Sequence, residues 1–298
     1  MIEFDVSFYL FYNHNFNPHV LNDKYKKEII TMYEQYWQIN EKPFENTPDP
    51  RFIYLSSEHV EALTRLSYAI EEQKGAALLT GVYGCGKTVI SRILFEILPQ
   101  DKYDICLVTN PMLSSVDLLR EICFQLGISH NNGGTKPKLL QSLNNHLFSN
   151  MNSHKETVII IDEAHTIRDI RTFEELRLLL NFQLNYKFLM TLVLIGQPEL
   201  IKKIEELKPL KQRLATRYHL TPLEKSEIKQ YIKHRLEIAG TTQDIFSDPA
   251  VDLIWEYSKG IPRMINHVCD ISLLIGFSND KEEIDKDTAE KAIRNLEY

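Results

Sequence analysis

The sequence predicts an α/β protein, with a parallel sheet covered by helices on both faces and a small all-helical domain after it. The first observation is the alternation of short apolar runs with longer amphipathic runs between residues 59 and 220. Strands that are apolar throughout and separated by helices are typical of buried parallel sheets. The second observation is that helical periodicity dominates after Pro222 and no further strand is evident. We therefore expect a domain boundary near residue 221.

The elements follow from hydrophobic spacing, taken in chain order. Apolar residues at helical spacing predict a first helix over 59–73. The runs that predict strands are 76–80, 104–109, 157–161, 188–195 and 217–220. Helical periodicity between them predicts helices near 87–97, 115–126, 137–150 and 172–185. In the C-terminal part, the same periodicity predicts helices over 224–239, 248–258, 262–276 and 286–296.

Composition is that of an ordinary globular protein. The chain has 298 residues, of which 43% are hydrophobic and 25% charged. A formal net charge of −7 excludes a protein that coats nucleic acid with a uniformly basic surface. A local basic face remains compatible with this charge. Four cysteines form no CxxC pair, and no apolar run reaches the roughly 18 residues of a membrane span. We expect a cytoplasmic protein without disulfides, structural zinc or a direct membrane span.

The strongest motif is a phosphate-binding loop between the expected strand 76–80 and the helix that follows it. Residues 81–88 read GVYGCGKT and fit GxxxxGK[ST] in full. Backbone N–H groups and a helix N-terminus hold phosphates in such loops. Lys87 is expected to reach the β and γ phosphates of ATP, and Thr88 to ligate Mg²⁺. The residues expected to contact the nucleotide here are Gly81, Val82, Tyr83, Gly84, Cys85, Gly86, Lys87, Thr88 and Val89.

One loop residue has two interpretations. Cys85 is either a filler at a variable position or a thiol whose pKa is lowered by the helix N-terminus, which would open it to redox control. The filler is the interpretation we favour.

A second motif is an acidic pair at the end of the expected strand 157–161. Asp162 follows four apolar residues and is placed to hold Mg²⁺, directly or through water. Glu163 is placed to orient and deprotonate the attacking water. Because both carboxylates are present, a P-loop scaffold that does not hydrolyse ATP is only a distant alternative.

The string DEAH at 162–165 is also a helicase box, but the rest of the chain excludes a two-domain helicase. Such an enzyme closes its site between two RecA-like domains, whereas the residues after His165 are mostly predicted to be helical. The strand 188–195 also ends in Gly-Gln-Pro-Glu rather than in the Ser-Ala-Thr motif of these helicases. His165 is therefore interpreted as a local hydrogen-bonding residue.

Taken with the P-loop and DEAH, the stretches IGQPEL and GIPRMIN resemble those of AAA+ ATPases. The similarity is closer to the ExeA/GspA (general secretion pathway protein A) group, which is related to the TniB and TnsC transposition ATPases. It extends over about residues 32–275 and includes NEKPFENTPDPRFIYLSSEHVEAL, ELRLLLNFQ and LVLIGQPEL. The resemblance implies a five-stranded parallel sheet of order 5-1-4-3-2 in residues 76–221. It also implies an adenine-wrapping segment at 32–75 and a helical lid at 222–298.

The same resemblance implies roles for residues outside the two motifs. Gln197 would be sensor 1, with capping of the turn before Pro198 as the alternative, and Arg263 would be sensor 2, with a salt-bridge role as the alternative. Asn110 would be a switch residue that restrains Glu163, although Asn before proline is also a common turn residue. The residues expected in the adenine-wrapping segment are Phe44, Pro48 and Tyr54.

An arginine finger implies an oligomer. Arg213 would reach the ATP of a neighbouring copy, and Arg217 is the second candidate for this role. The alternative for Arg213 is a surface arginine on a helix. A finger that acts in trans requires a homo-oligomer, a ring or a filament, assembled on ATP.

The first 31 residues are unlike the rest of the chain. The family-like segment begins at Met32-Tyr33, and Lys27-Glu28 can be encoded by a ribosome-binding sequence at a suitable distance upstream. We expect translation to start at Met32, with a partner-binding arm as the alternative.

Two biological roles remain open. The first is an assembly ATPase for secretion or pilus machinery, recruited to the inner membrane by a membrane component, since the longer ExeA-type proteins carry a membrane span and a peptidoglycan-binding domain. The second is a regulator that binds duplex DNA and licenses a transposase. Glutamates interleave with the basic residues on which the second role depends, so a mixed solvated surface is equally compatible with them. These residues are Lys202, Lys203, Lys208, Lys211, Arg213, Arg217, Lys225, Lys229, Lys233 and Arg235.

Overall fold

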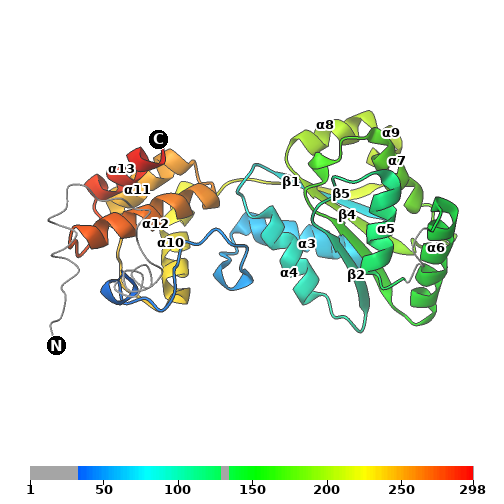
Figure 1. Ribbon diagram of the computed structural model, residues 1–298, viewed down its shortest axis with the longest axis horizontal. Helices are drawn as coiled ribbons and strands as arrows, with labels where there is room; N and C mark the ends of the chain where they lie inside the picture. Colours follow the sequence, from blue (N-terminus) through cyan, green and yellow to red (C-terminus); the bar gives the residue numbers. More distant parts are fainter. Residues whose placement is uncertain (1–32, 129–133, 298) are drawn as a thin grey trace.

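The computed structural model describes residues 33–128 and 134–297 (Figure 1). Residues 1–31, to which the prediction of a later translation start applies, lie outside the described part. The described chain forms an α/β domain and a helical lid, which lie side by side and are joined by extended connections (Figure 1).

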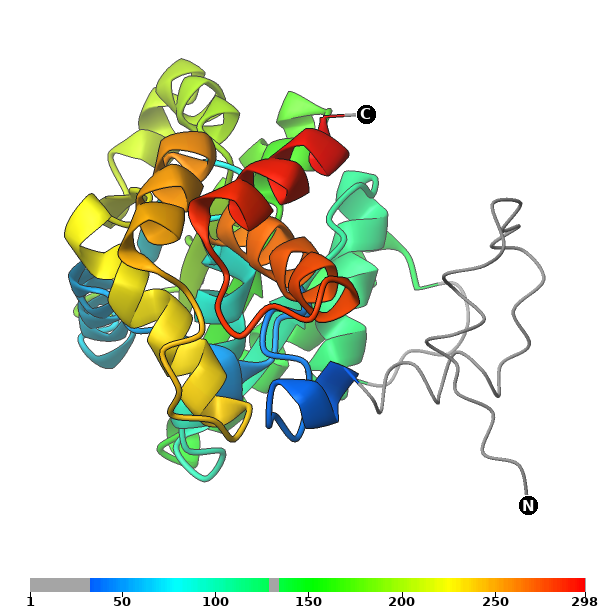
Figure 2. The same cartoon turned by 90° about the vertical axis from the view of Figure 1, so that its left-hand side faces the viewer.

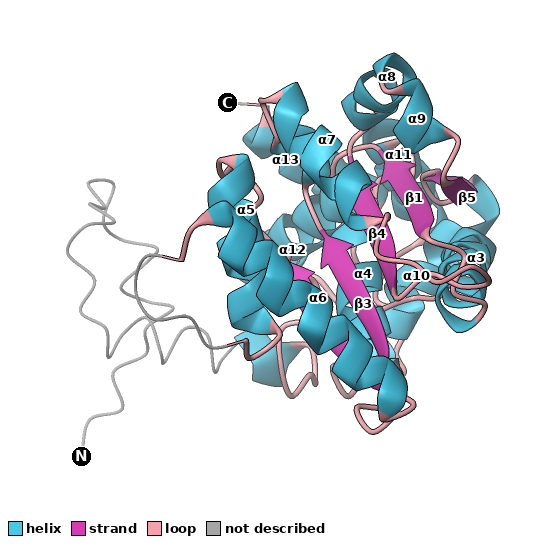
Figure 3. Ribbon diagram, turned by 90° about the vertical axis from the view of Figure 1, so that its right-hand side faces the viewer, coloured by secondary structure: helices cyan, strands magenta, loops and turns pink. Residues whose placement is uncertain are grey.

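Five parallel strands form one sheet of order β2-β3-β4-β1-β5, which confirms the predicted order read from the other edge. The central strands β1, β3 and β4 are buried almost throughout, because helices cover both faces (Figure 3). The edge strand β5 alternates buried and exposed residues, so it is longer than the apolar run alone predicts. The strand bounds are β1 Ala76–Gly81, β2 Tyr103–Val108, β3 Glu156–Ile161, β4 Met190–Gly196 and β5 Leu214–Leu220.

Alternate strand residues supply two hydrophobic cores, one on each face of the sheet. Val158 and Ile160 belong to the core under α3 and α4, whereas Ile159 and Ile161 belong to the core under α5 to α9. The short helices α8 and α9 were not predicted, and α7 ends at Leu179, before an antiparallel bridge between residues 183 and 188. The helix bounds are α3 Ser57–Glu71, α4 Lys87–Ile97, α5 Ser115–Gln125, α6 Lys136–Asn152, α7 Ile170–Leu179, α8 Glu199–Glu206 and α9 Lys208–Lys211.

The lid contains four helices and, in addition, the first described residues of the chain. Trp37 and Phe44 are buried in the same core as α10 to α13, and the Trp37 Nε1–H donates to the carbonyl of Leu273 (3.0 Å). Figure 2 shows this N-terminal segment, in blue, against the lid helices. The lid helices are α10 Lys225–Ile238, α11 Asp248–Ser258, α12 Pro262–Ser278 and α13 Lys286–Leu296.

Along the sequence, the first described residues therefore belong to the lid, the next to the α/β domain and the last to the lid again. Residues 33–52 pack in the lid core, and α3 packs against the sheet. Strand β5 ends at Leu220 and α10 begins at Lys225, so the return connection lies where the sequence predicts a boundary. Among the residues that the structure describes, no helix combines the length and the apolar character that a membrane span requires.

Candidate functional site

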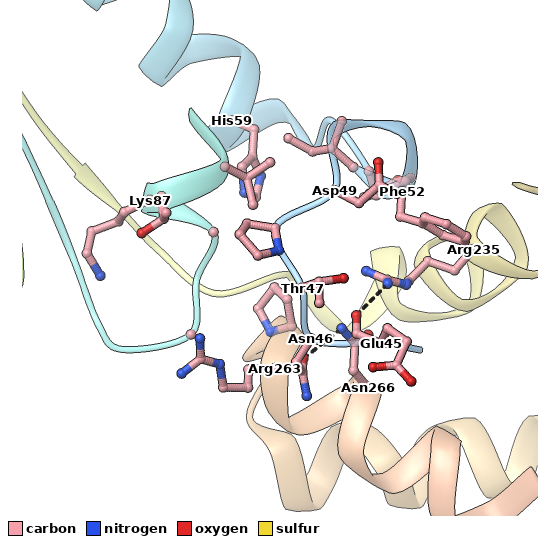
Figure 4. Close-up of a pocket in the computed structure, with 18 of the residues that line it drawn as sticks. Glu45, Asn46, Thr47, Asp49, Phe52, His59, Lys87, Arg235, Arg263 and Asn266 are labelled. Carbon is pink, nitrogen blue, oxygen red and sulfur yellow. Dashed lines mark hydrogen bonds between the residues drawn. The ribbon is translucent and has the colours of Figure 1, made fainter. Parts of the chain in front are cut away.

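A cavity of about 180 Å³ lies where the α/β domain and the lid meet. In Figure 4, Lys87 and His59 of the α/β domain lie on one side of it, and Arg235 and Asn266 of the lid lie on the other. The N-terminal segment passes between them and supplies the rim. The segment residues that line the cavity are Glu45, Asn46, Thr47, Pro48, Asp49, Phe52, Ile53 and Tyr54.

The phosphate-binding loop leads from β1 into α4 along the floor of the cavity. Gly84 and Gly86 both have positive φ (86° and 94°), a conformation that a side chain disfavours. Gly86 is the N-cap of α4, and no side chain caps its first turn, so backbone N–H groups are left for an anion. Gly84, Gly86, Thr88 and Val89 line the cavity, as the motif predicts.

Lys87 is almost fully buried at the start of α4. Its Nζ donates to the Val82 carbonyl of the same loop (2.9 Å). Burial lowers the pKa of the ammonium, and the nearby Glu163 carboxylate opposes this shift. The lysine thus lies folded onto the loop, within the site that its motif assigns to it.

Asp162 and Glu163 differ in environment although they are neighbours. Asp162 is 1% exposed, and its Oδ2 accepts from the Ser91 hydroxyl (3.1 Å) while its Oδ1 accepts from the Glu163 backbone N–H (2.8 Å). The same hydroxyl lies 2.9 Å from the Thr88 carbonyl, so its single hydrogen is shared between the carboxylate and the first turn of α4. Glu163 adopts the left-handed conformation (φ 52°) and lines the cavity. Asp162 is therefore anchored, and Glu163 is the carboxylate that faces the cavity.

The lid contacts the loop through the start of α12. The Arg263 backbone N–H donates to the Gly84 carbonyl (3.3 Å), and its guanidinium lies 4.3 Å from the centre of the Tyr83 ring. A Cβ on Gly84 would come within 2.9 Å of the Arg263 Cβ. This close approach places a lid arginine at the edge of the cavity.

The loop residues Gly81, Val82 and Cys85 lie outside the cavity lining, and so do Gln197, Asn110 and Phe44. Gln197 is half-buried at the end of β4, where its backbone N–H donates to Nδ1 of His165 (3.3 Å). Asn110 is exposed after β2 and accepts from the Met112 backbone N–H (3.4 Å), as a turn residue does. Phe44 is buried against Phe246 in the lid core (ring centres 5.9 Å apart). Of the predicted adenine-wrapping residues, only Pro48 and Tyr54 line the cavity.

The two candidate arginine fingers lie on the surface near α9 and β5. Arg213 Nη2 donates to Asn181 Oδ1 (2.7 Å), and its Nη1 is buried without a hydrogen-bond partner among the described residues. Arg217 is exposed, donates to the Lys211 carbonyl (2.7 Å) and lies 3.9 Å from Glu205. Neither guanidinium reaches the cavity of its own chain.

Cys85 does not have a lowered pKa. The thiol is 1% exposed, and burial raises its pKa to about 11, so it stays protonated at neutral pH. The nearby Lys87 ammonium lowers the pKa less than burial raises it, so the structure favours the filler interpretation of this residue.

Several cavity residues were not predicted from the sequence. His59 accepts a hydrogen bond from the Ser56 hydroxyl at Nδ1 (2.6 Å) and donates from Nε2 to the Cys85 carbonyl (3.1 Å). In the lid, Tyr231 donates to Asn266 Oδ1 (2.7 Å), and Asn266 donates to the side chain of Asn46 (3.0 Å). These residues are polar and isolated in the sequence, so no local pattern marks them.

Comparison with known proteins agrees with the fold and the loop. The family model described as "AAA domain" matches residues 70–204. The chain is 38% identical over 256 residues to general secretion pathway protein A of Aeromonas hydrophila, which covers 85% of this chain and 46% of that protein. It is 28% identical over 147 residues to an uncharacterised HTH-type transcriptional regulator of Methanocaldococcus jannaschii, with 48% and 36% covered. The chain thus spans less than half the length of either relative.

Solved structures show the same fold at low sequence identity. The ORC2 protein of Aeropyrum pernix, in ADPNP and ADP complexes, matches with a TM-score of 0.65 at 15% identity, covering 86% of this chain and 71% of that one. The RuvB Holliday junction branch migration motor of Thermotoga maritima matches with a TM-score of 0.53 at 20% identity, covering 83% and 73%. At these identities the likeness establishes the fold.

Proposed function

Because the chain is an AAA+ protein related to general secretion pathway protein A, we propose that it binds ATP with Mg²⁺ in the cavity between its two domains and hydrolyses the ATP to ADP and phosphate. The observation that carries this proposal is the convergence of three groups. The uncapped start of α4, the anchored Asp162 and the cavity-facing Glu163 lie around one loop. Phosphoryl transfer requires little of a protein beyond such positioned charge.

The phosphate end of ATP fits the floor of the cavity. The N–H groups of the loop and of the first turn of α4 would hold the β and γ phosphates. Lys87 would leave the Val82 carbonyl and pair with the phosphates, which offsets the cost of its burial. Arg263 would turn from the Tyr83 ring to the same phosphates, so lid position would respond to the nucleotide.

The residues around α4 also fit a magnesium ion. The Thr88 hydroxyl and the buried Asp162 carboxylate would hold Mg²⁺, which neutralises phosphate charge when bound. Ser91 keeps one Asp162 oxygen oriented toward α4. Glu163 would accept a proton from the attacking water, and Gln197 at the end of the neighbouring strand would contact that water or the γ phosphate.

The base end of ATP fits the lid side of the cavity. Tyr54 lines it and packs edge-on against Tyr231 (ring centres 6.0 Å apart). Asn266 and Asn46 supply amide groups beside these rings. A purine would thus meet aromatic surface with a few polar partners, as small-ligand pockets commonly provide.

Two substitutions test the proposed activity. We expect Lys87→Ala to abolish ATP binding, because the phosphates lose their buried cation. We expect Glu163→Gln to bind ATP with nearly unchanged affinity and to lose about 10²–10⁴-fold in turnover, the usual contribution of a general base. Binding of a fluorescent ATP analogue and release of phosphate measure the two effects. Normal turnover in Glu163→Gln would refute the role of this residue as the base.

We also propose that hydrolysis requires a homo-oligomer assembled on ATP. Arg213 and Arg217 lie away from the cavity of their own chain, as a finger acting on a neighbour's ATP would. We therefore expect the activity per molecule to rise with protein concentration. An activity that stays constant over a wide dilution series would contradict the proposal.

For the biological role, we propose an assembly ATPase of secretion or pilus machinery that a membrane component recruits from the cytoplasm. The relative with 38% identity supports this role by its name. The basic residues proposed for DNA binding lend the alternative little support. Lys225 and Lys229 pair with Asp252 and Asp248, Lys211 and Arg217 with Glu205, and Arg235 is buried.

Duplex DNA distinguishes the two roles. A transposition regulator would show strong stimulation of its ATPase by duplex DNA, and the stimulation would fall steeply between low and physiological salt. We expect no such stimulation. A salt-sensitive increase in rate would favour the DNA-binding alternative.

A further inference from the structure

His165 connects the ends of two neighbouring strands. The backbone N–H of Gln197, at the end of β4, donates to His165 Nδ1 (3.3 Å). On the other side of the ring, His165 Nε2 lies 3.5 Å from Glu163 Oε2, at the end of β3. The imidazole is 14% exposed, so it is largely shielded from water.

The hydrogen bond from Gln197 determines which ring nitrogen carries the proton. A backbone N–H can only donate, so Nδ1 is the unprotonated acceptor. The neutral imidazole then carries its hydrogen on Nε2, which faces the Glu163 carboxylate. At 3.5 Å the two atoms are closer to an ion-pair contact than to a hydrogen bond of ordinary length, and the contact places the imidazole edge beside the carboxylate.

The surrounding backbone is built to hold the ring in this place. The Nζ of Lys203 in α8 donates to the carbonyls of His165 and Ile167 (both 2.6 Å). A Cβ on Gly196 would lie 3.1 Å from the His165 backbone nitrogen and 3.3 Å from its Nδ1. A glycine at the end of β4 therefore permits the close approach of the imidazole. These contacts leave the ring little freedom to rotate.

We propose that His165 is a positioning residue for Glu163, and that it couples the orientation of this carboxylate to the position of Gln197 at the end of β4. This inference rests on the proposed function, in which Glu163 is the general base. A displacement of the β4 end, such as a γ phosphate at Gln197 would produce, moves the N–H that orients the imidazole. The Nε2–H donor then moves relative to Glu163, so the base is aligned when the strand end is in its nucleotide-bound position.

Two nearly isosteric substitutions separate the two sides of the ring. His165→Asn places an amide oxygen near the Nδ1 position and has no group that reaches Glu163. His165→Gln places an amide N–H near the Nε2 position and retains the donor to Glu163. We expect His165→Asn to lower kcat by about 10-fold, a part of the 10²–10⁴-fold contributed by a general base. We expect its KM for ATP to stay unchanged and His165→Gln to recover most of the loss in kcat.

The outcomes distinguish this inference from the proposed function. Equal kcat for His165→Asn and wild type would overturn the inference, and so would an equal loss in both variants, which a merely structural role predicts. A Glu163→Gln variant is measured alongside, alone and combined with His165→Asn. If Glu163→Gln hydrolyses ATP normally, the proposed function fails with the inference. If it is inactive while His165→Asn is fully active, only the inference fails. In the inactive background, His165→Asn should cause no further loss.

Discussion

The replacement of Arg235 by lysine tests how the N-terminal segment is held on the lid. Arg235 is 7% exposed on α10, and its Nε donates to the Pro43 carbonyl (2.6 Å) while its Nη2 donates to the Glu45 carbonyl (2.9 Å). Its Nη1 donates to the Tyr231 hydroxyl (3.2 Å), and its guanidinium lies 5.1 Å from the centre of the Phe52 ring. The Arg235 side chain thus holds the N-terminal segment, which forms the cavity rim, against α10.

The expected loss follows from these contacts. Lysine keeps the charge but lacks the planar fork, so it can serve one of the two carbonyls and leaves the other without this donor. An unsatisfied buried polar group costs about 1–3 kcal/mol. Loss of the stacked guanidinium costs about 0.5–1 kcal/mol more. We expect Arg235→Lys to lower the free energy of unfolding of the lid by about 1.5–4 kcal/mol.

Urea unfolding followed by tryptophan fluorescence measures this loss, because Trp37 is buried in the lid core and Trp255, the other tryptophan, packs against it. With a urea m-value of about 2 kcal/mol/M, the midpoint should fall by about 0.7–2 M. The exposed Lys233 on the same helix provides the matched control, and Lys233→Gln should leave the midpoint nearly unchanged. ATP binding should weaken in Arg235→Lys alone. A midpoint within about 0.3 M of wild type would refute the reasoning.

Two further predictions concern the loop and its neighbours. Burial lowers the pKa of His59, so the unfolded state takes up a proton first as the pH falls. The neutral His59 contributes fully to the free energy of unfolding at a pH above about 6.5, the pKa of histidine in the unfolded chain. As the pH falls from there toward the lower pKa of the folded state, this contribution is lost, by at most about 1.4 kcal/mol per pH unit. In urea titrations between pH 7.5 and 5.5, His59→Gln should therefore lose less stability than wild type, and an equal loss would contradict this assignment. Gly84→Ala adds a Cβ within 2.9 Å of the Arg263 Cβ, at a residue with positive φ. We therefore expect this variant to lose about 1–2 kcal/mol in the free energy of unfolding. We also expect it to bind ATP more weakly, as measured by calorimetry. Unchanged affinity would show that the lid does not need to approach the loop this closely.

The sequence alone determined the fold class and the centre of the candidate site. Residues 81–88 connect the end of β1 to the first turn of α4 as predicted, because the glycines, the lysine and the threonine lie within one continuous segment. Asp162 and Glu163 follow β3 as predicted, because a run of apolar residues that ends in carboxylates marks the end of a buried strand. These predictions succeed because local spacing is sufficient to make them.

Only the tertiary structure decided which distant residues meet at the site. The sequence predicts Arg235 to be one of several basic surface residues. In the structure it is buried and donates to the carbonyls of Pro43 and Glu45, 192 and 190 positions earlier in the chain. Phe44 reads as a nucleotide contact but packs in the lid core. The sequence predicts His165 only as a local hydrogen-bonding residue, whereas the structure shows that its ring lies between Glu163 and the end of β4. Each of these placements depends on the packing of separate elements against one another, and local sequence periodicity carries no information about which polar groups that packing brings together.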